Sequence, residues 1–273
     1  MDASRKITLM GIVNLTDDSY FAPSRISVAE GTESLTDRVR TMIREGAGII
    51  DIGACSTRPG AAPVGAAEEW SRLAPALKAL REEFPETDIS VDTVHSEVAE
   101  RAYGLIGNFI VNDISAGEAD GRMLPLVGRL GLRYAAMHMR GTPETMQSLA
   151  HYDDAVSEIM AYFRSFSAKA EENGIGDWIL DPGFGFAKTL EQNYEILSSL
   201  ETFRSFGRPV LAGISRKSMV YGLLGITPEE ALPATQVLHL KALENGADIL
   251  RVHDVAEAAR TVTLYRRLNY SSM

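Results

Sequence analysis

Short apolar runs recur along the chain, separated by segments in which apolar residues repeat every three or four positions. A short apolar run indicates a buried strand, whereas the longer repeat indicates an amphipathic helix. The predicted strands are residues 7–13, 48–52, 88–91, 109–111, 133–137, 178–180, 209–212 and 248–252. Eight strands alternating with helices over roughly 250 residues predict an α/β fold, a (β/α)8 TIM barrel. We expect a single domain over residues 1–273, with a doubly wound open sheet as the alternative.

Two stretches carry recognisable helix starts. In residues 189–203 apolar positions repeat at helical spacing, and Thr189 with Gln192 matches a capping box. Residues 227–230 (TPEE) combine an N-cap threonine, a proline at the first helical position and two acidic residues, so they predict a helix that begins there. A further short helix is expected to open at the loop 213–218 and to end near Gly222.

Polar residues stand at or just after the end of every predicted strand. In a barrel the strand ends and the following loops converge on one mouth, where active sites are built. We therefore expect these residues to line one pocket. They are Asn14, Asp51, Asp92, Asn112, Asp113, His138, Asp181, Ser215, Arg216, Lys217, Arg251 and His253.

The last predicted strand places Arg251 and His253 on one side, because side chains alternate along a strand with period two. A fixed cation beside a titratable donor suggests an anion site. Residues 56–60 (STRPG) carry hydroxyls and a guanidinium in a loop that can close over a ligand. Residues 213–218 (GISRKS) put two cations beside two hydroxyls at a helix start, which is an arrangement suited to phosphate.

Composition narrows the class of protein. The 27 basic and 37 acidic residues give a formal net charge of −10, which argues against a dedicated nucleic-acid binder and against a protein of anionic membrane surfaces. No stretch approaches the ~20 apolar residues that span a bilayer. The only cysteine, Cys55, excludes an internal disulfide and fits a cytoplasmic location. No phosphate-binding GxxxxGK[ST] or dinucleotide-binding GxGxxG motif follows a strand.

A series of motifs resembles that of the bacterial dihydropteroate synthase family, in the family's order and over nearly the whole chain. The matching stretches are 10–14 (MGIVN), 51–53 (DIG), 56–60 (STRPG), 90–93 (SVDT), 111–115 (VNDIS), 137–143 (MHMRGTP), 181–186 (DPGFGF), 213–218 (GISRKS) and 251–253 (RVH). The resemblance implies a barrel that condenses 6-hydroxymethyl-7,8-dihydropterin diphosphate with 4-aminobenzoate in folate synthesis. It also implies magnesium as the cofactor and a homodimer.

Residue roles follow from the same resemblance. The positions that match the family's pterin-binding residues are Asp92, Asn112, Asp181 and Lys217. Those that match the diphosphate site are Asn14, Arg251 and His253, with Asn14 also matching the magnesium ligand. Those that match the aminobenzoate site are Thr57, Arg58, Pro59, Phe186 and Ser218.

The family resemblance further implies a dissociative reaction similar to SN1, in which diphosphate leaves the pterin methylene before the arylamine attacks. Arg251 and His253, with magnesium, would stabilise the leaving oxygens. Asp92 and Asp181 would stabilise the positive pterin, and Lys217 completes the expected catalytic residues. No protein nucleophile is required, in agreement with the absence of a nucleophile and base pair from the sequence.

Two positions depart from the family pattern. Residues 16–24 read TDDSYFAPS, so Asp17 replaces the usual proline and the later glycines are lost. This loop is expected to order over the diphosphate, so its changed stiffness would alter closure and turnover. Cys55 replaces the glutamate that usually precedes the STRP motif.

Two alternative functions stay open at this point. A methyl-transfer protein with a related pterin-binding barrel would share the pterin carboxylates and the asparagine, but it has no need of residues 56–59 or of Arg251 with His253. A catalytically idle pterin-binding paralogue is favoured only by the altered loop at residues 16–24. It would bind the pterin diphosphate without releasing diphosphate when 4-aminobenzoate is added.

Overall fold

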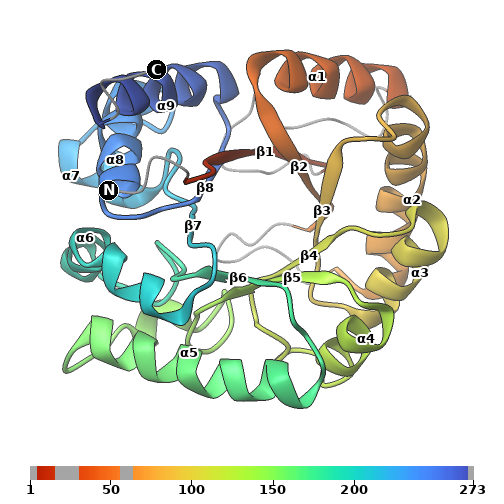
Figure 1. Ribbon diagram of the computed structural model, residues 1–273, viewed down its shortest axis with the longest axis horizontal. Helices are drawn as coiled ribbons and strands as arrows, with labels where there is room; N and C mark the ends of the chain where they lie inside the picture. The colour runs from red at the N-terminus through yellow and green to blue at the C-terminus, as the bar shows by residue number, and fades with distance from the viewer. Residues whose placement is uncertain (1–4, 16–30, 56–63, 270–273) are drawn as a thin grey trace.

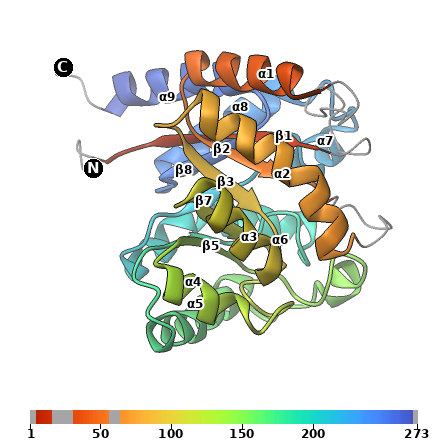
Figure 2. The same ribbon diagram turned by 90° about the vertical axis from the view of Figure 1, so that its right-hand side faces the viewer.

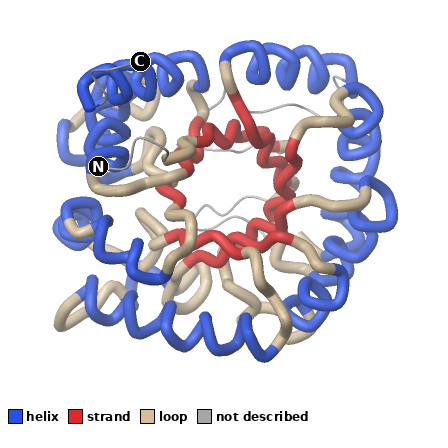
Figure 3. The backbone as a smooth tube through the Cα atoms, viewed as in Figure 1, coloured by secondary structure: helices blue, strands red, loops and turns tan. Residues whose placement is uncertain are grey.

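The computed structural model describes residues 5–15, 31–55 and 64–269. Within these residues eight strands form one sheet in the order β6-β5-β4-β3-β2-β1-β8-β7, and neighbouring strands pair in parallel. A backbone bridge between Leu180 and Val210 joins the two ends of that order. The ring of strands in Figure 3 therefore closes into a (β/α)8 barrel, which confirms the predicted fold over the open sheet.

The strands lie where the apolar runs predicted them, with ends that shift by no more than two residues. They are β1 (Thr8–Asn14), β2 (Ala47–Gly53), β3 (Asp88–Asp92), β4 (Ile110–Asp113), β5 (Arg133–Met137), β6 (Trp178–Asp181), β7 (Leu211–Ala212) and β8 (Ile249–Val252). The first two strands are seven residues long and β7 is two residues long, so the barrel wall differs in depth around its circumference.

Helices surround the barrel on its outside, as Figure 1 shows. They are α1 (Gly31–Glu45), α2 (Ala66–Glu83), α3 (Ser96–Ile106), α4 (Met123–Leu130), α5 (Ala155–Glu172), α6 (Leu190–Ser198), α7 (Ser218–Leu224), α8 (Leu232–Glu244) and α9 (Val255–Asn269), with the 3-10 helices η3 (Met146–Leu149) and η4 (Leu200–Phe206). Figure 2 gives the side view, with α2 and α3 in front of the strands. Within the described ranges, none of these helices combines the length and apolarity needed to cross a membrane.

The core has two main parts, one on each face of the strands. The larger part fills the space between the strands and the helices and includes the fully buried Trp178, Tyr134 and Phe163. A smaller apolar layer takes one residue from each of seven strands: Met10, Ile49, Ile110, Ala135, Ile179, Leu211 and Ile249. Because these residues form a separate cluster, we place this apolar layer inside the barrel, where TIM barrels pack their inward side chains.

The apolar layer fixes where the polar residues point. Side chains of a strand alternate between its two faces, so the residue two positions further along shares the face of the apolar one. The pairs are Ile49 with Asp51, Ile110 with Asn112, Ile179 with Asp181, and Ile249 with Arg251. The inward face of each of these strands thus changes from apolar to polar toward its carboxyl end.

Helix starts were predicted with mixed success. The capping box of Thr189 and Gln192 is confirmed, but the helix it opens ends at Ser198 and a 3-10 helix follows. The helix start predicted at Thr227 is wrong, because α8 begins at Leu232. Thr227 and Glu230 do exchange the two bonds of a capping box, at 2.9 and 3.4 Å, but they close only a single turn. The short helix α7 ends at Leu224, two residues beyond the predicted Gly222.

Candidate active site

A cavity of about 390 Å³ lies at the carboxyl ends of the strands. The residues with a role implied by the resemblance line it, as far as the structure describes them: Asn14, Asp92, Asn112, Asp181, Phe186, Lys217, Ser218, Arg251 and His253. Of the other strand-end residues expected at this pocket, Ser215 and Arg216 also line it, but the expectation is wrong for Asp51, Asp113 and His138. Asp51 is bound by Arg251 and Asn112, Asp113 accepts from Tyr134, and His138 packs against Tyr162. The predicted aminobenzoate residues Thr57, Arg58 and Pro59, and the atypical loop 16–24, lie outside the described residues. The structure therefore brings together strand ends from all round the barrel, as the pattern of polar residues predicted.

Arg251 is held between two carboxylates at the floor of this cavity. It donates from Nε to Asp51 Oδ2 at 2.7 Å and from Nη2 to Asp92 Oδ2 at 2.9 Å. Asp51 is fully buried, and it also accepts from Ser90 Oγ at 2.6 Å and from Asn112 Nδ2 at 3.2 Å. The sequence had placed Asp51 at the mouth without giving it a role. Its partners assign it the task of orienting Arg251 and Asn112.

The Asp92 carboxyl has an altered affinity for protons. Burial raises its pKa above the ordinary value, the Arg251 guanidinium acts against this, and the Asp51 charge raises it further. Asp92 therefore takes up a proton more readily than a surface aspartate does. A carboxyl group in this condition can accept a hydrogen bond when ionised and donate one when protonated.

Asp181 and Lys217 stand on another side of the cavity. Asp181 Oδ1 accepts from the backbone N–H of Gly183 at 2.8 Å. Lys217 donates from Nζ to the carbonyl of Phe184, and Nζ lies 4.6 Å from the centre of the Phe186 ring. Burial lowers the pKa of Lys217 to about 8, although the Asp181 charge raises it. Burial raises the pKa of Asp181, and Lys217 lowers it.

A buried lysine shapes the loop between these two groups. Lys188 donates from Nζ to the carbonyls of Gly183 at 2.9 Å and Phe186 at 2.8 Å, and lies 3.1 Å from His138 Nδ1. Gly183 has φ of +73°, and a Cβ there would come within 2.1 Å of the His138 carbonyl oxygen. Burial lowers the pKa of Lys188 and of His138. Sequence reasoning did not single out Lys188, two residues beyond the DPGFGF motif, because only the closed loop brings its acceptors together.

His253 is joined to the loop after β7. Ser215 Oγ accepts from the backbone N–H of His253 at 3.2 Å and lies 3.0 Å from His253 Nδ1. Burial lowers the pKa of His253 to about 3, and the Arg251 charge lowers it as well. The imidazole is therefore neutral near pH 7, so it can offer one donor nitrogen and one acceptor nitrogen.

The loop 213–218 departs from one expectation. We predicted two cations facing an anion, but the Arg216 guanidinium is bound by Asp254 and by two backbone carbonyls. Its charge is already balanced inside the protein. Lys217 is therefore the cation of this loop that can interact with a ligand in the cavity.

Cys55 lines the cavity beyond β2. Burial raises the pKa of its thiol, and the charge of Glu69 raises it further. The thiol therefore stays protonated at neutral pH, and a protonated thiol is a poor nucleophile. This agrees with leaving Cys55 out of the catalytic residues.

The side chains at the cavity show what ligands the protein could offer to a magnesium ion. Within the described residues no group of three or more His, Cys, Asp or Glu side chains could hold a metal ion. Asn14 ends β1 and lines the cavity, where its amide oxygen offers one hard ligand. Magnesium commonly takes only one or two ligands from a protein and the rest from water and substrate phosphates, so the residues fit an ion carried with a diphosphate.

Comparison with known proteins identifies the family. A family model described as pterin binding enzyme matches residues 10–253. A dihydropteroate synthase from Escherichia coli is 42% identical over 259 residues, which cover 93% of this chain and 89% of the relative. One from Synechocystis is 38% identical over 262 residues, which cover 95% and 89%.

Solved structures agree in fold and sequence. Yersinia pestis dihydropteroate synthase in complex with a sulfonamide drug matches with a TM-score of 0.91 and 35% identity, over 100% of this chain and 97% of that one. The Thermus thermophilus enzyme in complex with 4-aminobenzoate matches with a TM-score of 0.84 and 36% identity, over 98% and 96%. The chain with the Arg251 and Lys217 cavity therefore belongs to the dihydropteroate synthase family of pterin binding enzymes, which are transferases of folate synthesis.

Proposed function

We propose that this protein condenses 6-hydroxymethyl-7,8-dihydropterin diphosphate with 4-aminobenzoate to give 7,8-dihydropteroate and diphosphate. The observation that carries the proposal is one cavity in which carboxylates, an amide and cations converge from separate strands. Asp92, Asn112 and Asp181 supply the acceptors and donors that the amino and amide edge of a pterin requires. The relative from Thermus thermophilus that binds 4-aminobenzoate supports the second substrate.

The reaction we infer is dissociative. The bond between the pterin methylene carbon and the diphosphate oxygen breaks, and the electron pair leaves with the diphosphate. The amine nitrogen of 4-aminobenzoate then bonds to the methylene carbon and loses a proton. Asp92 and Asp181 face the cavity from two sides and would stabilise the positive pterin, while His253 and Arg251 would bind the departing oxygens.

Magnesium is part of the proposal, with Asn14 as its ligand from the protein. When bound, the ion would supply charge neutralisation to the leaving group. A cytoplasmic location is also proposed, because a protein with one cysteine needs no oxidising compartment.

A homodimer through α8 and α9 completes the proposal. These two helices pack against each other and expose large apolar side chains, with Val237 at 66%, Leu264 at 63% and Leu268 at 69% exposure. A second copy of this chain suits such a face, and the family resemblance implies one. Light scattering is expected to give twice the chain mass, and Leu264→Glu should reduce it to the chain mass. Leu105→Glu on α3 is the matched control that should leave the dimer intact, and a monomeric wild-type protein would reject this interface.

The decisive experiment mixes purified protein, Mg²⁺, the pterin diphosphate and 4-aminobenzoate, and measures dihydropteroate and diphosphate. We expect both products in equal amounts. Tight binding of the pterin diphosphate without either product would favour the idle paralogue. Methyl transfer to or from a reduced pterin, again without these products, would favour the methyltransferase.

The dissociative step has a separate test. Pterin diphosphate is labelled with ¹⁸O at the oxygen that joins the methylene carbon to phosphorus. It is incubated with enzyme and Mg²⁺ while the amine is withheld. If the carbon–oxygen bond breaks first, the label should scramble into non-bridging positions. Absence of scrambling, in enzyme that forms dihydropteroate once the amine is added, would argue for direct displacement.

A further inference from the structure

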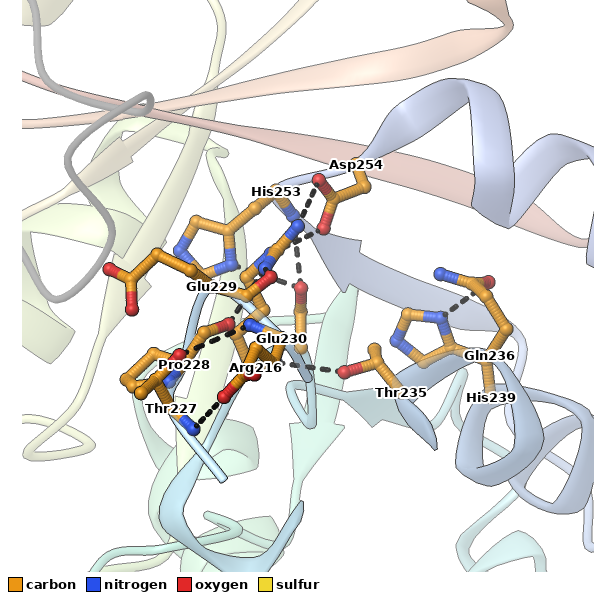
Figure 4. Close-up of polar contacts among 11 residues, drawn as sticks. Arg216, Thr227, Pro228, Glu229, Glu230, Thr235, Gln236, His239, His253 and Asp254 are labelled. Atoms are coloured by element: carbon orange, nitrogen blue, oxygen red, sulfur yellow. Dashed lines mark hydrogen bonds and ion pairs between the residues drawn. The ribbon is translucent and has the colours of Figure 1, made fainter. Parts of the chain in front are cut away.

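The Arg216 side chain connects its own loop to residues 228–229 and to Asp254, as Figure 4 shows. It donates to both carboxylate oxygens of Asp254, from Nε at 2.8 Å and from Nη2 at 2.9 Å. Its Nη1 donates to the carbonyls of Pro228 at 2.7 Å and Glu229 at 2.8 Å. Arg216 is 5% exposed, so this planar fork is shielded from solvent. The contact thus differs from the surface ion pairs that contribute little.

This contact extends the pairing of two strands beyond their ends. β7 pairs with β8 through only Leu211 with Ile249 and Ala212 with Leu250. Further along, Ser215 bonds to His253 and Arg216 bonds to Asp254 at a separation of 38 residues in each case. That separation is the same as in the backbone ladder. Side-chain bonds therefore keep the two segments in register beyond the point where the backbone hydrogen bonds of β7 and β8 end.

The backbone at Arg216 is held in an uncommon conformation. Its φ is +52°, a region that costs a residue with a side chain of order 1 kcal/mol unless its surroundings fix it. Its N–H donates to Thr235 Oγ1 at 3.3 Å, in addition to the four side-chain bonds. The next two residues are Lys217 and Ser218, which line the cavity. The direction of both side chains thus depends on the conformation of Arg216.

We propose that Arg216 is a positioning residue that, together with Asp254, sets Lys217 and Ser218 at the correct distance from Arg251 and His253. It links the loop that carries the pterin and aminobenzoate side to the strand end that carries the leaving-group side. This inference rests on the proposed synthase reaction. Arg216 acts through its neighbours in the chain, because its guanidinium binds Asp254 and the carbonyls of Pro228 and Glu229.

The main variant is Arg216→Lys, which keeps the charge but loses the fork to Asp254. We expect turnover to fall roughly 10- to 100-fold, the cost of a misplacement of about 1 Å at a reacting centre. We expect the Kd for the pterin alcohol, which lacks the diphosphate, to rise much less than turnover falls, because Lys217 is one of four pterin-binding groups and Asp92, Asn112 and Asp181 lie on other strands. A role limited to folding would instead weaken pterin binding as much as turnover, and that result would overturn the proposal.

A second variant and a matched control complete the experiment. Asp254→Asn removes the other half of the contact, so it should reproduce the loss, and the double variant should lose no more than the worse single variant. Arg204→Lys alters a more exposed arginine–aspartate pair, in which a single Arg204 nitrogen lies 3.3 Å from Asp248, just before the other end of β8. It should keep wild-type turnover. If Arg216→Lys does not fold, Asp254→Asn alone decides by the same comparison of turnover with pterin binding.

The outcomes separate this inference from the proposed function. A wild-type protein that forms no dihydropteroate would count against the synthase reaction itself. A wild-type protein that forms dihydropteroate, beside an Arg216→Lys variant with unchanged kcat and KM, would count against the positioning role alone.

Discussion

Two groups of polar and charged residues, each with members that line the cavity, are built in different ways. The strand cluster consists of Asp51, Asp92, Asn112 and Arg251, and its guanidinium binds both carboxylates directly, at 2.7 and 2.9 Å. The loop cluster consists of His138, Asp181, Lys188 and Lys217, and its lysines donate mainly to backbone carbonyls. Pairing between the strands fixes the direction of the strand-cluster side chains, whereas buried lysines and glycine turns fix the loop cluster. The strand cluster should therefore govern stability and the loop cluster should govern turnover.

Asp51→Ala should give the largest effect. We expect the free energy of unfolding to fall by about 3–5 kcal/mol, because a partner of a buried ion pair is removed and Arg251 loses its better-shielded carboxylate. Urea denaturation measures the change. Asp88→Ala breaks a mostly exposed pair with Arg133 and should cost less than about 1 kcal/mol. Equal losses in the two variants would contradict the distinction between the clusters.

Asp181→Asn should act on chemistry more than on stability. We expect turnover to fall roughly 100-fold, the cost of losing one electrostatic contact that strengthens in the transition state. Pterin binding should weaken too, because an amide converts an ionic acceptor partly into a donor. Steady-state kinetics and pterin titration measure both quantities, and unchanged kinetics would reject the assignment of Asp181.

Arg251→Lys should separate two ligands that differ only in the diphosphate. Binding of the pterin diphosphate should weaken about 10-fold more than binding of the pterin alcohol, since a bond to a charged group contributes about 1.5 kcal/mol or more. Calorimetric titration of both ligands gives the comparison. Equal losses would mean that Arg251 serves only its two carboxylates.

The pH dependence of Lys217 should give the smallest effect. Its pKa of about 8 in the folded protein lies below the ordinary 10.5, so it loses its charge as the pH rises through 8. Pterin binding should weaken above that pH, and Lys217→Arg should abolish the weakening because arginine stays charged. The same pKa shift has the opposite effect on folding stability as the pH rises. The unfolded chain binds the extra proton between pH 8 and 10.5, so this residue makes wild-type stability rise with pH there. Lys217→Met should remove that rise in thermal denaturation measured across this range.

Sequence reasoning succeeded where a local rule determines the result. Strand positions followed from apolar runs, and the placement of Arg251 and His253 on one side followed from the period of two along a strand. It failed where a partner lies far away in the chain. Asp51 and Arg251 are 200 residues apart, and the direction of Arg216 depends on Asp254, so only closure of the barrel reveals those contacts.

Local signals also misled in one place. The capping pattern at Thr227 is satisfied by a single turn, and the carbonyls of that turn accept from Arg216 before α8 begins. A sequence carries no sign that a turn will be used in this way. The roles of Thr57, Arg58 and Pro59 stay predictions, because they lie outside the described residues.

The apolar layer inside the barrel has a consequence for the order of events. Met10, Ile49 and Ile179 belong to the layer that fills the barrel beneath the cavity, so substrates have to enter from the mouth above it. Asn112 and Asp181 lie two residues above this layer, deeper than Ser218 of the following loop. A pterin held at that depth would be covered by an aminobenzoate at the mouth. We therefore expect the pterin diphosphate to bind first and the kinetics to follow a compulsory sequence of addition.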